Sequence, residues 1–89
     1  MMDRKDNTRM YKAIDVILWE QWDPCGVNIF PGARDEYHSY ITKIMDLVTS
    51  GGAVENIRDY LLYVEKERMG LPGRKKKCLE VAKSLSELK

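Results

Sequence analysis

Apolar residues recur at steps of three and four along most of the chain, the spacing that stacks side chains on one face of a helix. In residues 8–22 this spacing produces a main face and a second face, so we expect the first helix to be central and contacted from two sides. It should start at Asn7 or Thr8, which are good N-caps, and end at Asp23, because a residue before proline avoids the α region. The main face consists of Tyr11, Ile14, Leu18 and Trp22. The second face consists of Val16 and Trp19, and Ile17 widens the apolar stripe.

Three further stretches have the same helical spacing. The second helix should begin at Asp35 and Glu36, whose carboxylates suit the positive end of a helix, and stop at Gly51. The third should run from near Ala53 to a C-cap at Gly70, and the fourth from about residue 74 to the end. Their expected inward positions are Tyr37, Tyr40, Ile41, Ile44, Leu47 and Val48; Val54, Ile57, Tyr60, Leu61 and Val64; and Cys78, Leu79, Ala82, Leu85 and Leu88.

No stretch alternates between apolar and polar residues with period two, so strands are not expected. The pattern therefore predicts an all-α protein, a compact bundle of about four helices in a single domain covering residues 1–89. The connection between the first two helices is about twelve residues, which is long for a bundle. Because it contains Val27, Ile29 and Phe30, we expect an ordered crossover loop with apolar side chains pinned against the helices.

Composition is ordinary for a soluble globular protein, with 44% hydrophobic and 33% charged residues. The first ten residues are polar, and no apolar run approaches the roughly 18 residues of a membrane span, so we expect a cytoplasmic protein that binds no membrane. Cys25 and Cys78 are distant in sequence and form no metal-binding motif. We expect two free thiols, with Cys78 buried, and neither metal nor cofactor.

Four consecutive basic residues, Arg74, Lys75, Lys76 and Lys77, stand where the fourth helix should begin. A cation near this positive helix end is unfavourable by about 0.3–1 kcal/mol, so a compensating anion is expected. The anion could be internal, from Glu65 or Glu67, or external, as a bound phosphate or nucleic acid. Residues 13–67 carry ten acidic and four basic groups, which disfavours nucleic acid.

Asp23, Asp35, Glu36 and His38 flank the loop and could converge for acid–base catalysis. The simpler interpretation assigns Asp23 to capping its own turn, the next two acids to a helix start and His38 to the surface. No catalytic motif accompanies these residues, so an enzyme is not favoured. Two aromatic residues, Trp19 and Tyr63, are instead candidates for contacts with another protein, together with Phe30 in the loop.

Three segments carry a family resemblance: Trp22-Asp23-Pro24-Cys25-Gly26-Val27, Asp35-Glu36-Tyr37-His38-Ser39-Tyr40 and Glu67-Arg68-Met69-Gly70-Leu71. With these segments the chain resembles small uncharacterised bacterial proteins and, more distantly, the YugE-like domain-of-unknown-function family. The resemblance implies a small helical bacterial protein, and no activity, ligand or site residue carries over from it.

Together these observations favour a small helical protein-interaction module, of the partner, inhibitor or immunity type. Its partner should be another protein, with Trp19, Phe30 and Tyr63 as contact residues. The alternative is anion or nucleic-acid binding through residues 74–77. A homodimer through the two-sided first helix also stays open.

Overall fold

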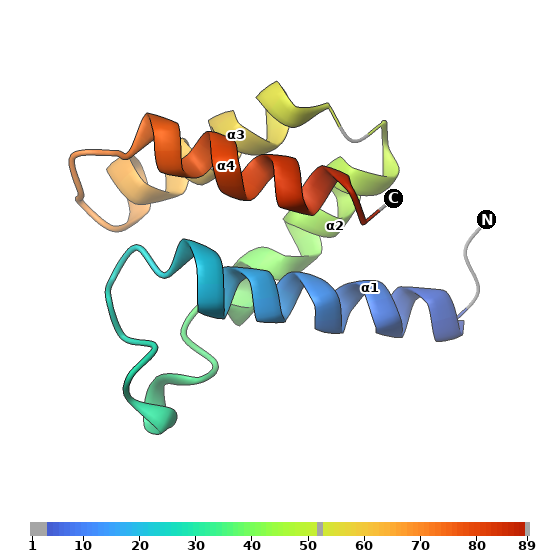
Figure 1. The fold of residues 1–89 in the computed structure, drawn as a ribbon, viewed down its shortest axis with the longest axis horizontal. Helices are drawn as coiled ribbons and strands as arrows, with labels where there is room; N and C mark the ends of the chain where they lie inside the picture. Colours follow the sequence, from blue (N-terminus) through green and yellow to red (C-terminus); the bar gives the residue numbers. More distant parts are fainter. Residues whose placement is uncertain (1–3, 52, 89) are drawn as a thin grey trace.

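The computed structural model describes residues 4–51 and 53–88, with side chains from residue 8 onward. Over these residues the chain forms helices joined by loops and turns, without a strand, so the prediction of an all-α bundle is confirmed. None of the described helices is long and apolar enough to cross a membrane. The four α-helices are α1 (Arg4–Ile17), α2 (Ile41–Thr49), α3 (Val54–Tyr63) and α4 (Lys75–Ser86) (Figure 1).

Two of the α-helices continue into a π-helical turn. Leu18–Trp22 extends α1 and Val64–Arg68 extends α3. The latter ends at Arg68 and is followed by Gly70, whose φ of 68° is the left-handed conformation expected of a glycine that stops a helix. The amide of Leu71 donates to the Glu65 carbonyl at 2.7 Å, and Leu71 is half-buried. The predicted end of the third helix is therefore confirmed.

Two predicted helix starts are wrong. α1 begins at Arg4 and passes through Asn7 and Thr8, because residues 4–8 contain neither proline nor glycine and both residues are tolerated inside a helix. α2 begins only at Ile41, after a 3₁₀ turn, and the backbone of Tyr37 before that turn (φ −104°, ψ 6°) is not helical. The predicted start of α4 is correct, with Arg74 as its N-cap.

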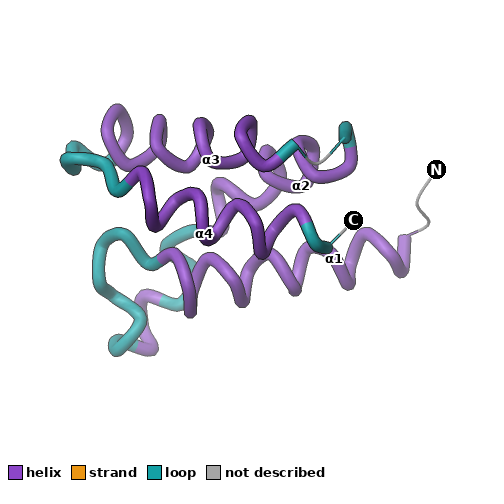
Figure 2. The backbone as a smooth tube through the Cα atoms, turned by 45° about the horizontal axis from the view of Figure 1, so that its top comes forward, coloured by secondary structure: helices purple, strands orange, loops and turns teal. Residues whose placement is uncertain are grey.

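The helices pack in neighbouring pairs. α3 lies against α4, and α4 also contacts α1 and its π-helical turn, while α2 contacts both α1 and α3. The long α1–α2 loop and the α3–α4 turn lie at the same end of the bundle in both views (Figures 1 and 2). Segments far apart in sequence therefore meet at that end.

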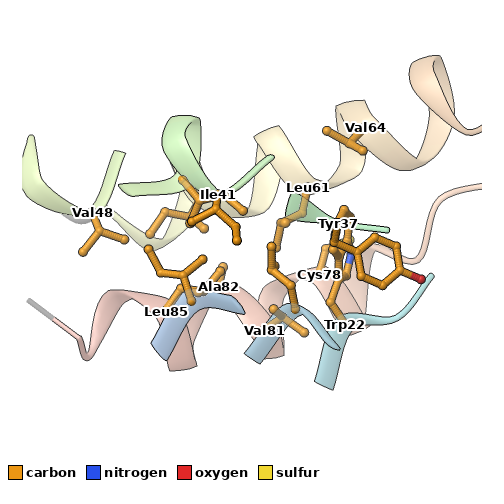
Figure 3. Packing of buried hydrophobic residues seen from close by; sticks show 14 residues of the cluster. Trp22, Tyr37, Ile41, Val48, Leu61, Val64, Cys78, Val81, Ala82 and Leu85 are labelled. Carbon is orange, nitrogen blue, oxygen red and sulfur yellow. The ribbon is translucent and has the colours of Figure 1, made fainter. Parts of the chain in front are cut away.

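Most of the predicted inward positions are buried. Val81, which was not among the predicted positions, is also buried. The remaining predicted positions of the second, third and fourth helices are half-buried. Burying a side chain of this size contributes about 1.5–3 kcal/mol. The hydrophobic core is formed by Ile14, Leu18, Trp22, Tyr37, Ile41, Ile44, Val48, Ile57, Leu61, Val64, Cys78, Val81, Ala82 and Leu85 (Figure 3).

The two-sided burial predicted for the first helix is only partly correct. Ile17 and Trp19 are half-buried against the core, but Tyr11 is 37% and Val16 is 43% exposed. The neighbouring helices cover the face that carries Ile14, and they leave Val16 open to solvent. α1 is thus a covering helix and not a central one.

Candidate functional site

The α1–α2 loop begins at Asp23, where the chain leaves the helix. The Asp23 amide donates to the Leu18 carbonyl at 2.9 Å, and its backbone is left-handed (φ 30°, ψ 59°), a conformation that Asp tolerates better than most residues. Its carboxylate accepts hydrogen bonds from the amides of Val27 (2.9 Å) and Asn28 (3.2 Å). Asp23 therefore caps its own turn, as predicted.

Tyr37 closes the other end of the loop. It is 2% exposed, and its hydroxyl donates to Asp23 Oδ1 at 2.6 Å and accepts from the Cys25 amide at 3.2 Å. Its ring lies 5.4 Å from the ring of Trp22. Burial raises the pKa of Tyr37, and the hydrogen bond to Asp23 raises it further, so the phenol stays protonated. These contacts hold the two ends of the loop together.

Both sides of the loop are also attached to Trp19. The side-chain amide of Asn28 donates to the Trp19 carbonyl at 3.2 Å. The guanidinium of Arg34 lies 5.1 Å from the centre of a Trp19 ring and donates to Asp15 Oδ1 at 2.8 Å. A cation over an indole ring at this distance contributes about 0.5–1 kcal/mol near the surface. Trp19 is thus a half-buried support for the loop.

The segment between these attachments projects from the bundle (Figure 1). Ile29 is 75% and Phe30 is 55% exposed, while Val27 is half-buried. We call Ile29 and Phe30 the loop tip. The expectation that the loop's apolar side chains are pinned on the helices is wrong for these two, because the backbone bonds from Phe30 to Val27 and from Ala33 to Phe30, each 2.9 Å, fold the loop on itself.

The charges near the loop tip are unevenly paired. Arg34 is in an ion pair with Asp15, whereas Glu20, Asp35 and Glu36 are exposed and make no ion pair with any described residue. The turn that carries the last two acids is fixed by a 2.9 Å bond from the Glu36 amide to the Ala33 carbonyl. An apolar tip is therefore accompanied by unpaired carboxylates.

A buried carboxylate contacts the residue that precedes the loop. Glu65 is fully buried, and it accepts hydrogen bonds from the indole N–H of Trp22 (2.8 Å), the backbone amide of Arg74 (2.9 Å) and the thiol of Cys78 (3.2 Å). The Arg74 guanidinium also donates to Glu65 Oε2 at 3.1 Å and to the Trp22 carbonyl at 2.8 Å. The network joins the start of α4 to the residue that precedes the loop.

The electrostatics of this network are those of a structural ion pair. Burial raises the pKa of Glu65, but hydrogen bonds from Arg74, Cys78 and Trp22 together lower it more, so its pKa lies below the ordinary value. Burial raises the pKa of Cys78 to about 12, and the neighbouring carboxylate contributes in the same direction. A thiol with such a pKa is a poor nucleophile, so this cluster has a supporting role.

The sequence pattern indicates Glu65 as a counter-ion for the basic residues, whereas the structure also buries it. A signal was present, since Ile57, Leu61 and Glu65 follow one another at steps of four and so share one face of α3 and its π-helical turn. A carboxylate on an apolar face is expected to have a partner. That partner proved to be Arg74, which is therefore compensated internally, as one of the alternatives held.

The other sequence candidates lie apart. Tyr63 is 51% exposed at the end of α3, not on the loop. Lys75 and Lys76 are exposed at the start of α4 and Lys77 is half-buried. The first two make no ion pair with any described residue. The structure thus brings Trp19 into contact with the loop that carries Phe30 and places Tyr63 and the lysines elsewhere.

The loop acids and His38 do not converge. Asp23 is bonded to Tyr37 and to its own turn, while His38 Nε2 lies 3.1 Å from Asp15 Oδ1 without a hydrogen bond. Within residues 4–51 and 53–88, no group of three His, Cys, Asp or Glu side chains could hold a metal ion. Cys25 and Cys78 are both free and Cys78 is buried, as predicted, while Cys25 is exposed.

Comparison of the chain with family models, with curated proteins and with solved structures gives no match. The likeness to YugE-like proteins therefore stays a prediction.

Proposed function

We propose that the protein is a small protein-interaction module of the partner, inhibitor or immunity type, and that its loop tip enters an apolar pocket on another protein. The observation that carries this proposal is the exposure of Ile29 and Phe30, 75% and 55%, on a loop whose ends are fixed. Full burial of an exposed side chain of this size contributes about 1.5–3 kcal/mol, and these two, which are already partly buried, would gain part of that. A partner's pocket supplies that burial.

The fixed backbone of the loop increases the binding affinity that these two side chains can provide. Loops that are ordered only on binding lose conformational entropy, and a preorganised loop avoids most of that cost. Here the Asp23–Tyr37 bond closes the loop, and Asn28 and Arg34 hold it to Trp19. Single exposed apolar residues are common on proteins, but two adjacent ones on a loop held at several points match the anchors of protein interfaces.

Photo-crosslinking tests the proposal at the level of single residues. The photoreactive p-benzoylphenylalanine replaces Phe30 in one variant and, as matched controls, the exposed Val16 and Tyr63 in two others. Each purified variant is irradiated in lysate of the source organism, and the products are identified by mass spectrometry. We expect one protein to be crosslinked from position 30 at least about tenfold more than from position 16.

Competition with unlabelled protein makes the test quantitative. Wild-type protein should abolish the crosslink, while Phe30→Ala should compete about tenfold less well or worse, as expected for a buried aromatic anchor. Equal crosslinking from positions 16 and 30, or none from position 30, would falsify the proposal. A product formed only from Tyr63 would move the interface to α3.

A second candidate function is anion or nucleic-acid binding at the start of α4. It is favoured by the exposure of Lys75 and Lys76, which make no ion pair with any described residue. Each phosphate contact gives a slope near −0.9 in a plot of log affinity against log salt, so Lys75→Ala with Lys76→Ala should reduce the slope by about 2. Electrophoretic mobility shifts at several salt concentrations measure this, and an unchanged slope excludes these lysines.

A further inference from the structure

We infer that the partner's apolar pocket is bordered by lysine or arginine side chains, an inference that rests on the proposed function. The reason is the charge that accompanies the loop tip. Residues 19–37 contain Glu20, Asp23, Arg34, Asp35 and Glu36 as their only charged residues. The charge of a suitable partner is set by those of the five side chains that have no ion-pair partner within the protein.

Two of the five charges are already satisfied within the protein. The Asp23 carboxylate accepts the Tyr37 hydroxyl at 2.6 Å and two loop amides, and Arg34 is paired with Asp15 at 2.8 Å. The other three, Glu20, Asp35 and Glu36, are exposed and unpaired among the described residues. Residues 19–37 therefore offer a partner three free carboxylates and no free cation.

Glu20 lies in the π-helical turn that precedes the loop, whereas Asp35 and Glu36 lie on the loop after its tip. Glu20 follows Trp19, whose ring contacts the Arg34 guanidinium, and Asp35 follows Arg34. Glu36 is in the adjacent turn, which the bond from its amide to the Ala33 carbonyl closes at 2.9 Å. Asn28 and Arg34 both hold the loop to Trp19. The three acids, which are near these attachments in sequence, therefore keep fixed places relative to the loop tip.

Charge complementarity then selects among the possible occupants. An anionic lipid surface would repel the three carboxylates, although the apolar tip alone would suit a membrane interface. A pocket without basic neighbours would leave the carboxylates partly desolvated and unpaired, which costs affinity. A pocket bordered by Lys or Arg pairs with them and accelerates association at low salt. The occupant is therefore a protein whose apolar pocket is bordered by Lys or Arg side chains.

A peptide selection tests this without knowledge of the natural partner. A phage library of random linear peptides of about 12 residues is selected on the wild-type protein and depleted on Phe30→Ala, so that only peptides that need the loop tip remain. The selected peptides are synthesised, and their Kd is measured by fluorescence anisotropy at about 50 and 300 mM NaCl, where screening differs strongly. We expect peptides that combine apolar residues with Lys or Arg.

Charge reversal supplies the matched variants. Asp35→Lys with Glu36→Lys should weaken these peptides about tenfold or more at the lower salt, and by less at the higher salt. Asp46→Lys with Glu80→Lys makes the same change in net charge at exposed positions of α2 and α4, and should change Kd less than about twofold. The comparison separates the charge beside the tip from the charge of the whole protein.

The outcomes distinguish this inference from the proposed function. Phe30-dependent peptides that lack Lys and Arg, or that bind both charge-reversal variants with equal Kd, contradict a basic border around the pocket. The proposed function as an interaction module is retained in that case. Failure to obtain any Phe30-dependent peptide, together with no crosslink from position 30, overturns both. Phe30-dependent binding to vesicles of phosphatidylcholine and phosphatidylglycerol, or Phe30-dependent self-association in analytical ultracentrifugation, also overturns the inference.

Discussion

Glu65→Gln keeps the shape of the buried side chain and removes its charge. In wild type Oε1 accepts from the Arg74 amide, and Oε2 accepts from the Trp22 indole, the Arg74 guanidinium and the Cys78 thiol. A glutamine amide turns an N–H₂ group toward one of these donor sets, so at least one buried donor loses its acceptor. An unsatisfied donor costs about 1–3 kcal/mol, and a hydrogen bond to a charged group contributes about 1.5–3 kcal/mol.

We therefore expect Glu65→Gln to lower the free energy of unfolding by about 3 kcal/mol. Urea denaturation followed by tryptophan fluorescence measures this as a midpoint lowered by about 1–3 M. Glu67→Gln is the matched control, since Glu67 is exposed in the same π-helical turn, and should cost less than about 0.5 kcal/mol. A Glu65→Gln cost equal to that of the control would refute the reasoning that the network holds α4 to the base of the loop.

The same variant has a pH signature. Because the folded-state pKa of Glu65 lies below its ordinary value of 4.5, its ionised form contributes stability that is fully present above that value and is lost as pH falls through the folded-state pKa. The difference in unfolding free energy between wild type and Glu65→Gln should be constant near neutral pH and shrink below pH 4.5. A difference that stays constant in acid would contradict the assigned direction of the pKa.

Three further predictions concern the loop and the thiols. Tyr37→Phe removes the bond to Asp23 and should cost about 1–2 kcal/mol, with faster hydrogen exchange of the loop amides by NMR. Phe30→Ala should lower the free energy of unfolding by less than about 0.5 kcal/mol in urea denaturation, because Phe30 is more than half exposed. With Ellman's reagent at neutral pH, the exposed Cys25 should react at once and the buried Cys78, with a pKa of about 12, only on unfolding.

Each of these has a result that contradicts it. Unchanged loop exchange in Tyr37→Phe would mean that Asp23 alone holds the loop. A cost above about 2 kcal/mol for Phe30→Ala would place that side chain in the core and remove it from the interface. Equal reaction rates for the two native thiols, measured against Cys25→Ser and Cys78→Ser, would contradict the burial of Cys78.

The sequence by itself determined the fold class and most of the core. Steps of three and four depend only on the geometry of one helix, so the buried faces around Ile14, Ile44, Ile57 and Leu85 could be predicted without knowledge of their partners. The end of the third helix at Gly70 was equally predictable, because left-handed backbone and the glycine that favours it are local properties. Helix starts were less predictable, since no strong local signal marks Arg4 or Ile41.

The tertiary structure decided the role of Glu65 and the direction of Phe30. The bond between Trp22 and Glu65 joins residues 43 apart in sequence, and periodicity records which face a side chain occupies, not which distant donors surround it. Likewise, apolar character in the loop predicted burial, but the backbone bonds from Phe30 to Val27 and from Ala33 to Phe30 fold the loop on itself and leave its tip exposed. Local spacing fixes helices and their faces, whereas buried charges and exposed anchors depend on contacts between segments that only the folded chain brings together.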